Sequence, residues 1–82
     1  MQAMYFSWLR ERVGTGSEMI DPGRATTVAE LIRELSARED RYAAAFQDIS
    51  AVRVAVDQQM VDMDHPLDGA REIGFFPPMT GG

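Results

Sequence analysis

The middle of the chain carries the pattern that most restricts its fold, an amphipathic helix that begins at a capping box. Thr27 and Glu30 stand three residues apart, so the threonine hydroxyl can accept the Glu30 amide while the glutamate reaches back. The apolar residues that follow recur at helical spacing and form one stripe: Val28, Leu31, Ile32 and Leu35. This spacing predicts a helix over 28–38 that buries one face against another layer.

Short apolar runs typical of β-strands lie on both sides of this helix. Before it, Met4–Leu9 predicts a first, central strand with Phe6 and Trp8 on one face, and Ser17–Ile20 predicts a weaker second strand. After the main helix, Arg41–Phe46 predicts a second short helix that buries Tyr42 and Phe46. Three further strands are expected at 51–56, at 60–61 and at 72–76.

The order of these elements predicts an α+β fold, with a mixed sheet of about five strands packed on one main helix plus a short second helix. The first and last strands are the most apolar, so we expect them to be central neighbours. They would pair in parallel, because the route between them passes through the helix. That arrangement is a β-grasp, or ubiquitin-like, fold. The 82 residues have room for one such domain, which we place at 1–76 with an extended tail at 77–82.

Composition excludes several classes of function. A formal net charge of −5 disfavours binding to nucleic acid, which depends on neutralising phosphates with basic side chains. No apolar run approaches the length of about 18 residues that predicts a membrane span, and no signal peptide is visible. With no cysteine, the chain has no disulfide and no thiolate nucleophile. These features predict a cytoplasmic protein that binds neither nucleic acid nor membrane.

The last residues of the sequence predict a reactive tail. Pro77 and Pro78 favour an extended stem, and Gly81 and Gly82 have no side chains, so such a tail can enter a narrow channel. The carboxylate of Gly82 is then the candidate reactive group, and Gly81 gives it access. Glycine-rich ends also occur as frayed tails without function, and the residues alone leave that alternative open.

Side chains near this tail are candidates for binding a partner. The apolar stem from Phe75 to Thr80 (Phe75, Phe76, Pro77, Pro78, Met79, Thr80) is expected to bind a partner, and Phe6, Met60 and Phe75 are expected to form a docking patch on the sheet. The loop Asp62–His65 has too few ligand residues for a metal site, so no metal is expected. Lysine is absent, so an activated terminus meets no side-chain amine in its own domain.

The ending Phe-Phe-Pro-Pro-Met-Thr-Gly-Gly resembles that of the molybdopterin synthase small subunits, a family of ubiquitin-like sulfur carriers. Further similar segments run in order along the chain: Tyr5-Phe6, Thr27-Val28-Ala29-Glu30-Leu31, Val54-Ala55-Val56-Asp57 and Asp64-His65-Pro66-Leu67. The sequence departs from the family at Asp57, where asparagine is usual. It departs again at Asp68–Glu72, where an acidic turn is usual.

The resemblance implies a β-grasp fold and a defined chemical cycle. An ATP-dependent enzyme adenylates the Gly82 carboxylate, and sulfur then replaces AMP to leave a thiocarboxylate, a 1-thioglycine. The synthase is a heterotetramer, and its large subunit holds the catalytic pocket. The tail enters that subunit, where sulfur passes to cyclic pyranopterin monophosphate. This chain would bind no cofactor of its own. Three alternatives remain open at this point: a thiamine-type sulfur carrier, a modifier conjugated to lysines, and an interaction domain whose tail never reacts.

Overall fold

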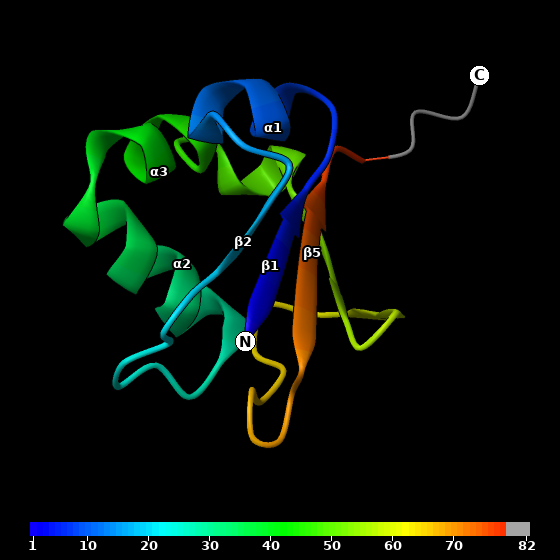
Figure 1. Ribbon diagram of the computed structural model, residues 1–82. Helices are drawn as coiled ribbons and strands as arrows, with labels where there is room; N and C mark the ends of the chain where they lie inside the picture. The colour runs from blue at the N-terminus through cyan, green and yellow to red at the C-terminus, as the bar shows by residue number, and fades with distance from the viewer. Residues whose placement is uncertain (79–82) are drawn as a thin grey trace.

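A computed structural model gives the structure of the chain and describes residues 1–78. One mixed sheet lies against a layer of helices (Figure 1). The elements in chain order are β1 (Gln2–Tyr5), α1 (Trp8–Val13), β2 (Ser17–Met19), α2 (Val28–Arg38), α3 (Asp40–Ala45), the 3-10 turn η1 (Ile49–Ala51), β3 (Arg53–Val56), β4 (Gln59–Val61) and β5 (Glu72–Phe76).

The strand order confirms the predicted β-grasp topology. Neighbours across the sheet run β2-β1-β5-β3-β4, with the first and last strands side by side in the centre. β1 and β5 pair in parallel, with Gln2 opposite Glu72 and Tyr5 opposite Phe75, whereas the other three pairings are antiparallel. Because β5 is hydrogen-bonded on both sides, its direction is fixed at the point where it ends, at Phe76.

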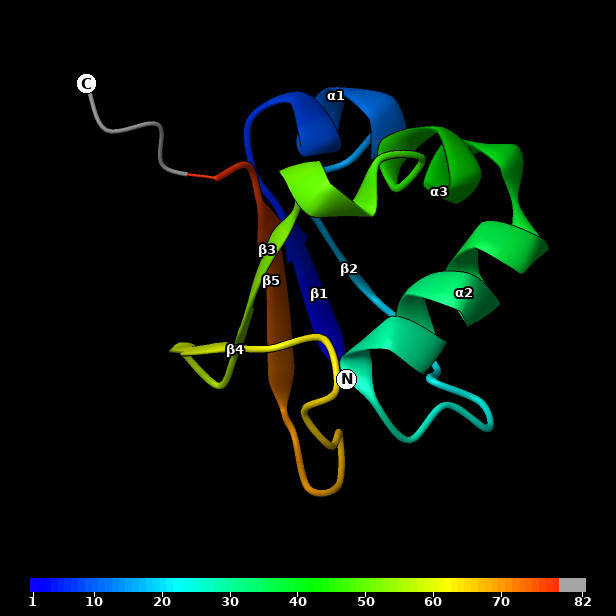
Figure 2. The same ribbon diagram turned by 180° about the vertical axis from the view of Figure 1, so that it is seen from behind.

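The core lies between the sheet and the helices. One face of each central strand supplies it, with Tyr5 and Phe75 stacked at a centroid distance of 5.7 Å and Phe46 edge-on to Phe75 at 4.9 Å. The predicted stripe of α2 is buried against them, as are Tyr42 and Phe46. Helix packing on one face leaves the other face of the sheet open, as Figures 1 and 2 show from opposite sides.

The main helix spans the predicted residues, and its cap differs from the prediction in one bond. The Thr27 hydroxyl accepts the Glu30 amide at 3.2 Å, as the capping box predicts. The Glu30 carboxylate, however, accepts from the amide and hydroxyl of Thr26, one residue earlier. The amides of Val28 and Ala29 donate to carbonyls of the loop 62–66, so this loop closes the N-terminus of α2.

The first strand is shorter than predicted. β1 ends at Tyr5, and the chain turns at Ser7, whose φ of 57° lies in the left-handed region. The residues expected to continue the strand begin α1 instead, because Leu9 and Val13 reach the core from one helical face at i, i+4 spacing. Trp8 therefore does not share a strand face with Phe6; it lies on α1 with the Arg12 guanidinium 4.7 Å above its ring.

A polar cluster joins β2 to β1 and α3 at the edge of the core. The Glu18 carboxylate accepts hydrogen bonds from the hydroxyls of Tyr5 and Tyr42 and pairs with Arg41 at 3.3 Å. Arg41 also donates to the carbonyl of Val13 and lies over the Tyr42 ring. A short edge strand with little apolar contact is thereby fixed to the rest of the domain.

Candidate functional site

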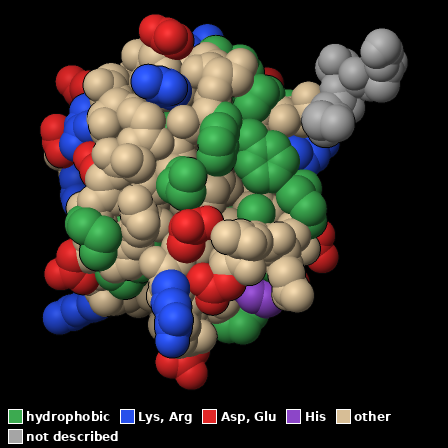
Figure 3. Space-filling view, turned by 45° about the vertical axis from the view of Figure 1, so that its right-hand side comes forward, with side chains coloured by type: hydrophobic (Ala, Val, Ile, Leu, Met, Phe, Trp, Pro, Cys, Tyr) green, Lys and Arg blue, Asp and Glu red, His purple; other side chains and the backbone are tan. Residues whose placement is uncertain are grey.

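The open face of the sheet carries an apolar patch at the end where β5 finishes. Phe6 and Met60 are 45% and 62% exposed, and the half-buried Met4 and Phe76 lie on the same face of the sheet. In Figure 3 the hydrophobic side chains gather on the upper part of this face, with acidic side chains below them. We define the apolar patch as Met4, Phe6, Met60 and Phe76.

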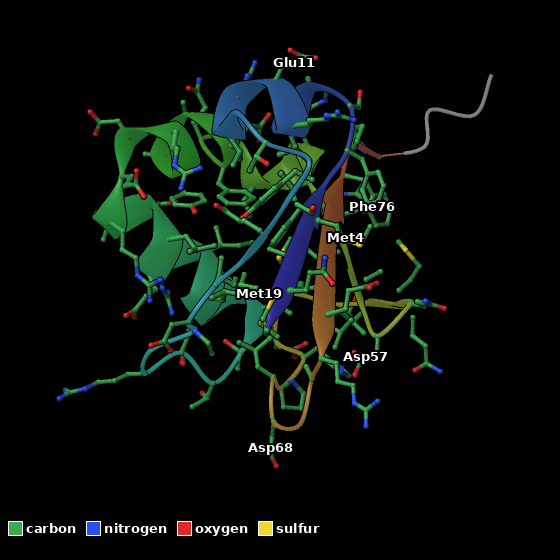
Figure 4. All side chains as sticks on the ribbon, in the orientation of Figure 1. Met4, Glu11, Met19, Asp57, Asp68 and Phe76 are labelled. Carbon is green, nitrogen blue, oxygen red and sulfur yellow. The ribbon has the colours of Figure 1, made fainter. Side chains whose placement is uncertain are left out.

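Strand register explains how residues of β1, β4 and β5 come together in one patch. Met4 lies opposite Gly74, Gly74 opposite Ala55, and Ala55 opposite Met60, so this row crosses β1, β5, β3 and β4. Residues directly opposite one another share a face of the sheet. Because glycine and alanine in the middle of the row have little or no side chain, the surface is recessed between the two methionines. Figure 4 shows Met4 and Phe76 on the side of the sheet away from the helices.

Phe6 links this row to the end of β5. Its ring lies edge-on to Phe76, with centroids 6.4 Å apart, and a Cβ built at Gly74 would meet it at 3.5 Å. The Phe6 amide also donates to the Phe75 carbonyl at 3.0 Å. These contacts hold Phe6 beside the residue that precedes the tail.

The structure corrects the expected role of Phe75. Its side chain is 0% exposed and packs between Tyr5 and Phe46, so it belongs to the core and cannot bind a partner from the open face. Because successive side chains of a strand point to opposite faces, Phe76 takes the outward position. The two adjacent phenylalanines therefore have different roles.

The remaining predicted residues belong to the tail. Pro77 and Pro78 follow β5 directly and are half-buried. Met79, Thr80, Gly81 and Gly82 lie outside the described residues. The tail thus begins at the end of a central strand and beside the apolar patch.

One cation borders the patch. Arg53 lies opposite Phe76 in the pairing of β3 with β5, and its guanidinium donates to the carbonyls of Ser50 and Val52. A shallow hollow between Arg53, Met60 and His65 runs along the edge of β4.

Neither a metal centre nor a membrane span is found in the described part of the chain. Residues 1–78 contain no group of three or more acidic or histidine side chains arranged to hold a metal ion. Among the same residues, no helix has the length and apolar character needed to cross a bilayer. The loop that contains Asp62 and His65 has a structural role, since its carbonyls accept amides from the start of α2.

Sequence reasoning missed one residue of the patch and one contact at the opposite end of β5. The alternation of side chains along a strand could have identified Met4, because it stands two residues before Phe6 and so shares its side of the chain. No local sequence pattern indicated the contacts that Asp57 makes. One oxygen of its carboxylate accepts the amides of Arg71 and Glu72, each at 3.0 Å, and its own amide donates to the Glu72 carbonyl. Asp57 therefore fixes the turn between β3 and β4 to the start of β5.

Comparison with known proteins agrees with this geometry. The chain matches the ThiS family model over residues 3–82. It is 38% identical to the molybdopterin synthase sulfur carrier subunit of Escherichia coli, covering 100% of the chain and 99% of that protein. The chain belongs to the ThiS family, among the molybdopterin synthase sulfur carrier subunits. The corresponding subunit of Haemophilus influenzae is 31% identical, again over 100% of this chain and 99% of the relative.

Solved structures support the fold of this ThiS-family chain. A putative molybdopterin converting factor, subunit 1, from Pyrococcus furiosus has a TM-score of 0.74 at 25% identity, with 95% of each chain covered. SAMP1 from Haloferax volcanii has a TM-score of 0.72 at 19% identity, with 100% of this chain and 98% of that chain covered. At that lower identity the likeness to SAMP1 concerns the fold alone.

Proposed function

We propose that this sulfur carrier subunit holds its sulfur at Gly82, as a C-terminal thiocarboxylate, and delivers it to the large subunit of molybdopterin synthase. The observation that carries the proposal is the full-length similarity to curated sulfur carrier subunits, which includes the Gly-Gly end. Gly81 leaves the backbone narrow enough for the enzyme channels that must admit the tail.

The chemistry requires activation before sulfur transfer. A carboxylate is a poor electrophile because oxide would have to leave, so ATP first converts the Gly82 carboxylate to an acyl adenylate with release of pyrophosphate. Sulfur from a donor then attacks the acyl carbon and AMP departs, which leaves the thiocarboxylate. That sulfur is proposed to pass to cyclic pyranopterin monophosphate in the catalytic pocket of the large subunit. With no cysteine in the sequence, the chain cannot carry the sulfur as a side-chain persulfide.

The apolar patch is proposed to dock this chain on both of its protein partners, the large subunit and the ATP-dependent adenylating enzyme. Exposed aromatic and methionine side chains are typical of interface cores, and such side chains supply binding energy away from the reacting atom. Phe6, Phe76 and Met60 provide them here, with the stem from Pro77 to Thr80 continuing the contact. Binding at the patch would place the tail at the entrance of the partner's pocket.

Intact-mass measurement tests the proposal. The full chain is incubated with ATP, the adenylating enzyme and a sulfur donor, and the expected product is heavier by the difference between sulfur and oxygen. Leaving out ATP should abolish the change. A mass that stays unchanged with every component present would rule out the carrier function. Covalent conjugates to other proteins in lysate would instead indicate a modifier.

A further inference from the structure

We propose that Met60 is an oxidation site through which peroxide switches off docking of the carrier on the large subunit. The inference rests on the function proposed above and names a means of regulating its docking surface. Methionine thioethers are oxidised in proteins where they are accessible, and the product is a polar sulfoxide. The sequence contains six methionines and no cysteine, so the thioethers are its oxidisable side-chain sulfurs.

Exposure selects two of the methionines in the described part of the chain. Met19 is 74% exposed and Met60 is 62% exposed, whereas Met1, Met4 and Met63 are half-buried. Both exposed residues lie on the open face of the sheet, since Met19 is opposite Gln2 and Met60 is opposite Ala55. Accessibility alone therefore does not tell whether oxidation of Met19 or of Met60 would affect docking.

Position within the sheet does distinguish them. Met60 lies in the row of Gly74, two residues and about 7 Å before the end of β5. Only the small Ala55 and Gly74 separate it from Met4 in that row, so it belongs to the apolar patch. Met19 lies in the row of Glu72, at the start of β5 and at the opposite edge of the sheet. Figure 4 shows Met19 away from Met4 and Phe76.

The chemical step is balanced with hydrogen peroxide as oxidant. The Met60 Sδ attacks one peroxide oxygen, an S–O bond forms and the O–O bond breaks. The departing hydroxide takes the proton of the new S–OH group and leaves as water. Sulfur loses two electrons and peroxide gains them. The new S=O group is a strong acceptor at the centre of an apolar contact, where a buried acceptor without a partner weakens binding by about tenfold or more.

The test measures the affinity of the full chain for purified large subunit by calorimetry, before and after treatment with hydrogen peroxide. Met19→Leu, Met60→Leu and Met79→Leu are treated in parallel, and each chain is compared with its own untreated sample. Peptide mapping locates the sulfoxides, because one added oxygen and one exchange of oxygen for sulfur change the intact mass by nearly equal amounts.

The expected result is a fall in affinity of about tenfold or more for the unaltered chain, Met19→Leu and Met79→Leu. Peroxide should lower the affinity of Met60→Leu far less than that of the unaltered chain, and methionine sulfoxide reductase should restore binding of the oxidised unaltered chain. Equal loss in Met60→Leu would overturn the proposal, as would unchanged binding of a chain with Met60 mapped as sulfoxide. An untreated chain that fails to bind the large subunit would instead refute the proposed function itself.

Discussion

At the scale of single residues, Asp57 shows how one side chain can join segments that lie far apart in the sequence. Its φ of 49° is positive, and its carboxylate accepts two amides from the start of β5. Asparagine, which the resemblance leads us to expect at this position, has an oxygen that can accept the same amides and also tolerates positive φ. Either residue can therefore hold the β3–β4 turn against β5.

Position 57 requires a backbone that tolerates positive φ and a side-chain oxygen that accepts two amides. Substitutions at Asp57 separate these two requirements. Asp57→Asn keeps both, so we expect the free energy of unfolding to change by less than about 0.5 kcal/mol. Asp57→Gly keeps the backbone freedom but loses the acceptor, and we expect it to cost about 1–2 kcal/mol, since water can reach the exposed amides. Urea unfolding measures both. A glycine variant as stable as the unaltered chain would show that the carboxylate contributes nothing.

Glu18 has a different role, because its ionised form is part of the cluster at the edge of the core. Partial burial by itself would raise the pKa of Glu18. Hydrogen bonds from Tyr42 and Tyr5 and the charge of Arg41 outweigh that effect and hold the pKa below its usual value of 4.5. The same cluster raises the pKa of Tyr42 to about 12, first through burial and then through its bond to Glu18.

The lowered pKa of Glu18 predicts how stability depends on pH. The folded pKa lies below the unfolded value, so the stabilisation is complete above about pH 4.5 and is lost as pH falls through the folded pKa. Glu18→Gln should lower the free energy of unfolding by about 2 kcal/mol at neutral pH. Its deficit should shrink in acid, and urea unfolding across pH measures this change. Glu11→Gln, on the exposed surface of α1, is the control, and a deficit of Glu18→Gln independent of pH would contradict the argument.

At the scale of elements, the layering of helices on one face decides which strand residues are free to bind. α2 and α3 cover the face that carries Tyr5 and Phe75, and the opposite face keeps Phe6, Met60 and Phe76 accessible. Contiguous apolar residues left on an open sheet face are a recognised sign of an interaction surface. The layering of the elements therefore leaves the apolar patch accessible on the same side of the sheet as Phe76, which precedes the tail.

A charge placed in the patch should affect binding and not folding. We expect Met60→Asp to weaken binding of the large subunit by tenfold to a few hundredfold, because a buried, unpaired carboxylate costs several kcal/mol at an interface. The exposed position should leave the melting temperature nearly unchanged. Ala37→Asp, which adds the same charge on the exposed side of α2, is the matched control. Equal weakening by both variants would show that the open face is not the docking surface.

At the scale of the whole molecule, the fold holds β5 in the centre of its sheet. The parallel pair of β1 and β5 lies in the middle of the sheet, and β5 is paired with β1 up to Phe75 and with β3 up to Phe76. A strand held in this way gives the following residues a defined starting point. Among the described residues, eighteen buried apolar side chains between residues 3 and 75 form the core.

Variants of the tail should therefore separate folding from function. Deleting Gly82 is expected to leave the melting temperature unchanged within about 1 °C and to abolish the mass change produced by ATP, adenylating enzyme and sulfur donor. Gly81→Val is expected to fold normally and to lower the rate of thiolation by at least about tenfold, because its side chain obstructs a narrow channel. Sulfur uptake by the shortened chain would refute the assignment of Gly82.

Local sequence signals by themselves determined much of the fold. The capping box and apolar stripe gave α2 its bounds. The apolar character of the first and last strands predicted that they are central neighbours, and the route through the helix predicted that they pair in parallel. These signals suffice because helix periodicity and N-caps act between residues only a few positions apart. The tail motif likewise predicted the family, because its residues are consecutive in the chain and need no fold to bring them together.

Only the tertiary structure decided which side of each strand faces the core. Alternation places Phe75 and Phe76 on opposite faces, but the helix layer determines that Phe75 is buried and Phe76 is outside. The end of β1 is decided in the same way, because the fit of Leu9 and Val13 to the core favours a helix over the predicted strand. The contacts of Asp57 and Glu18 join segments far apart in the sequence, and no local pattern specifies such pairings.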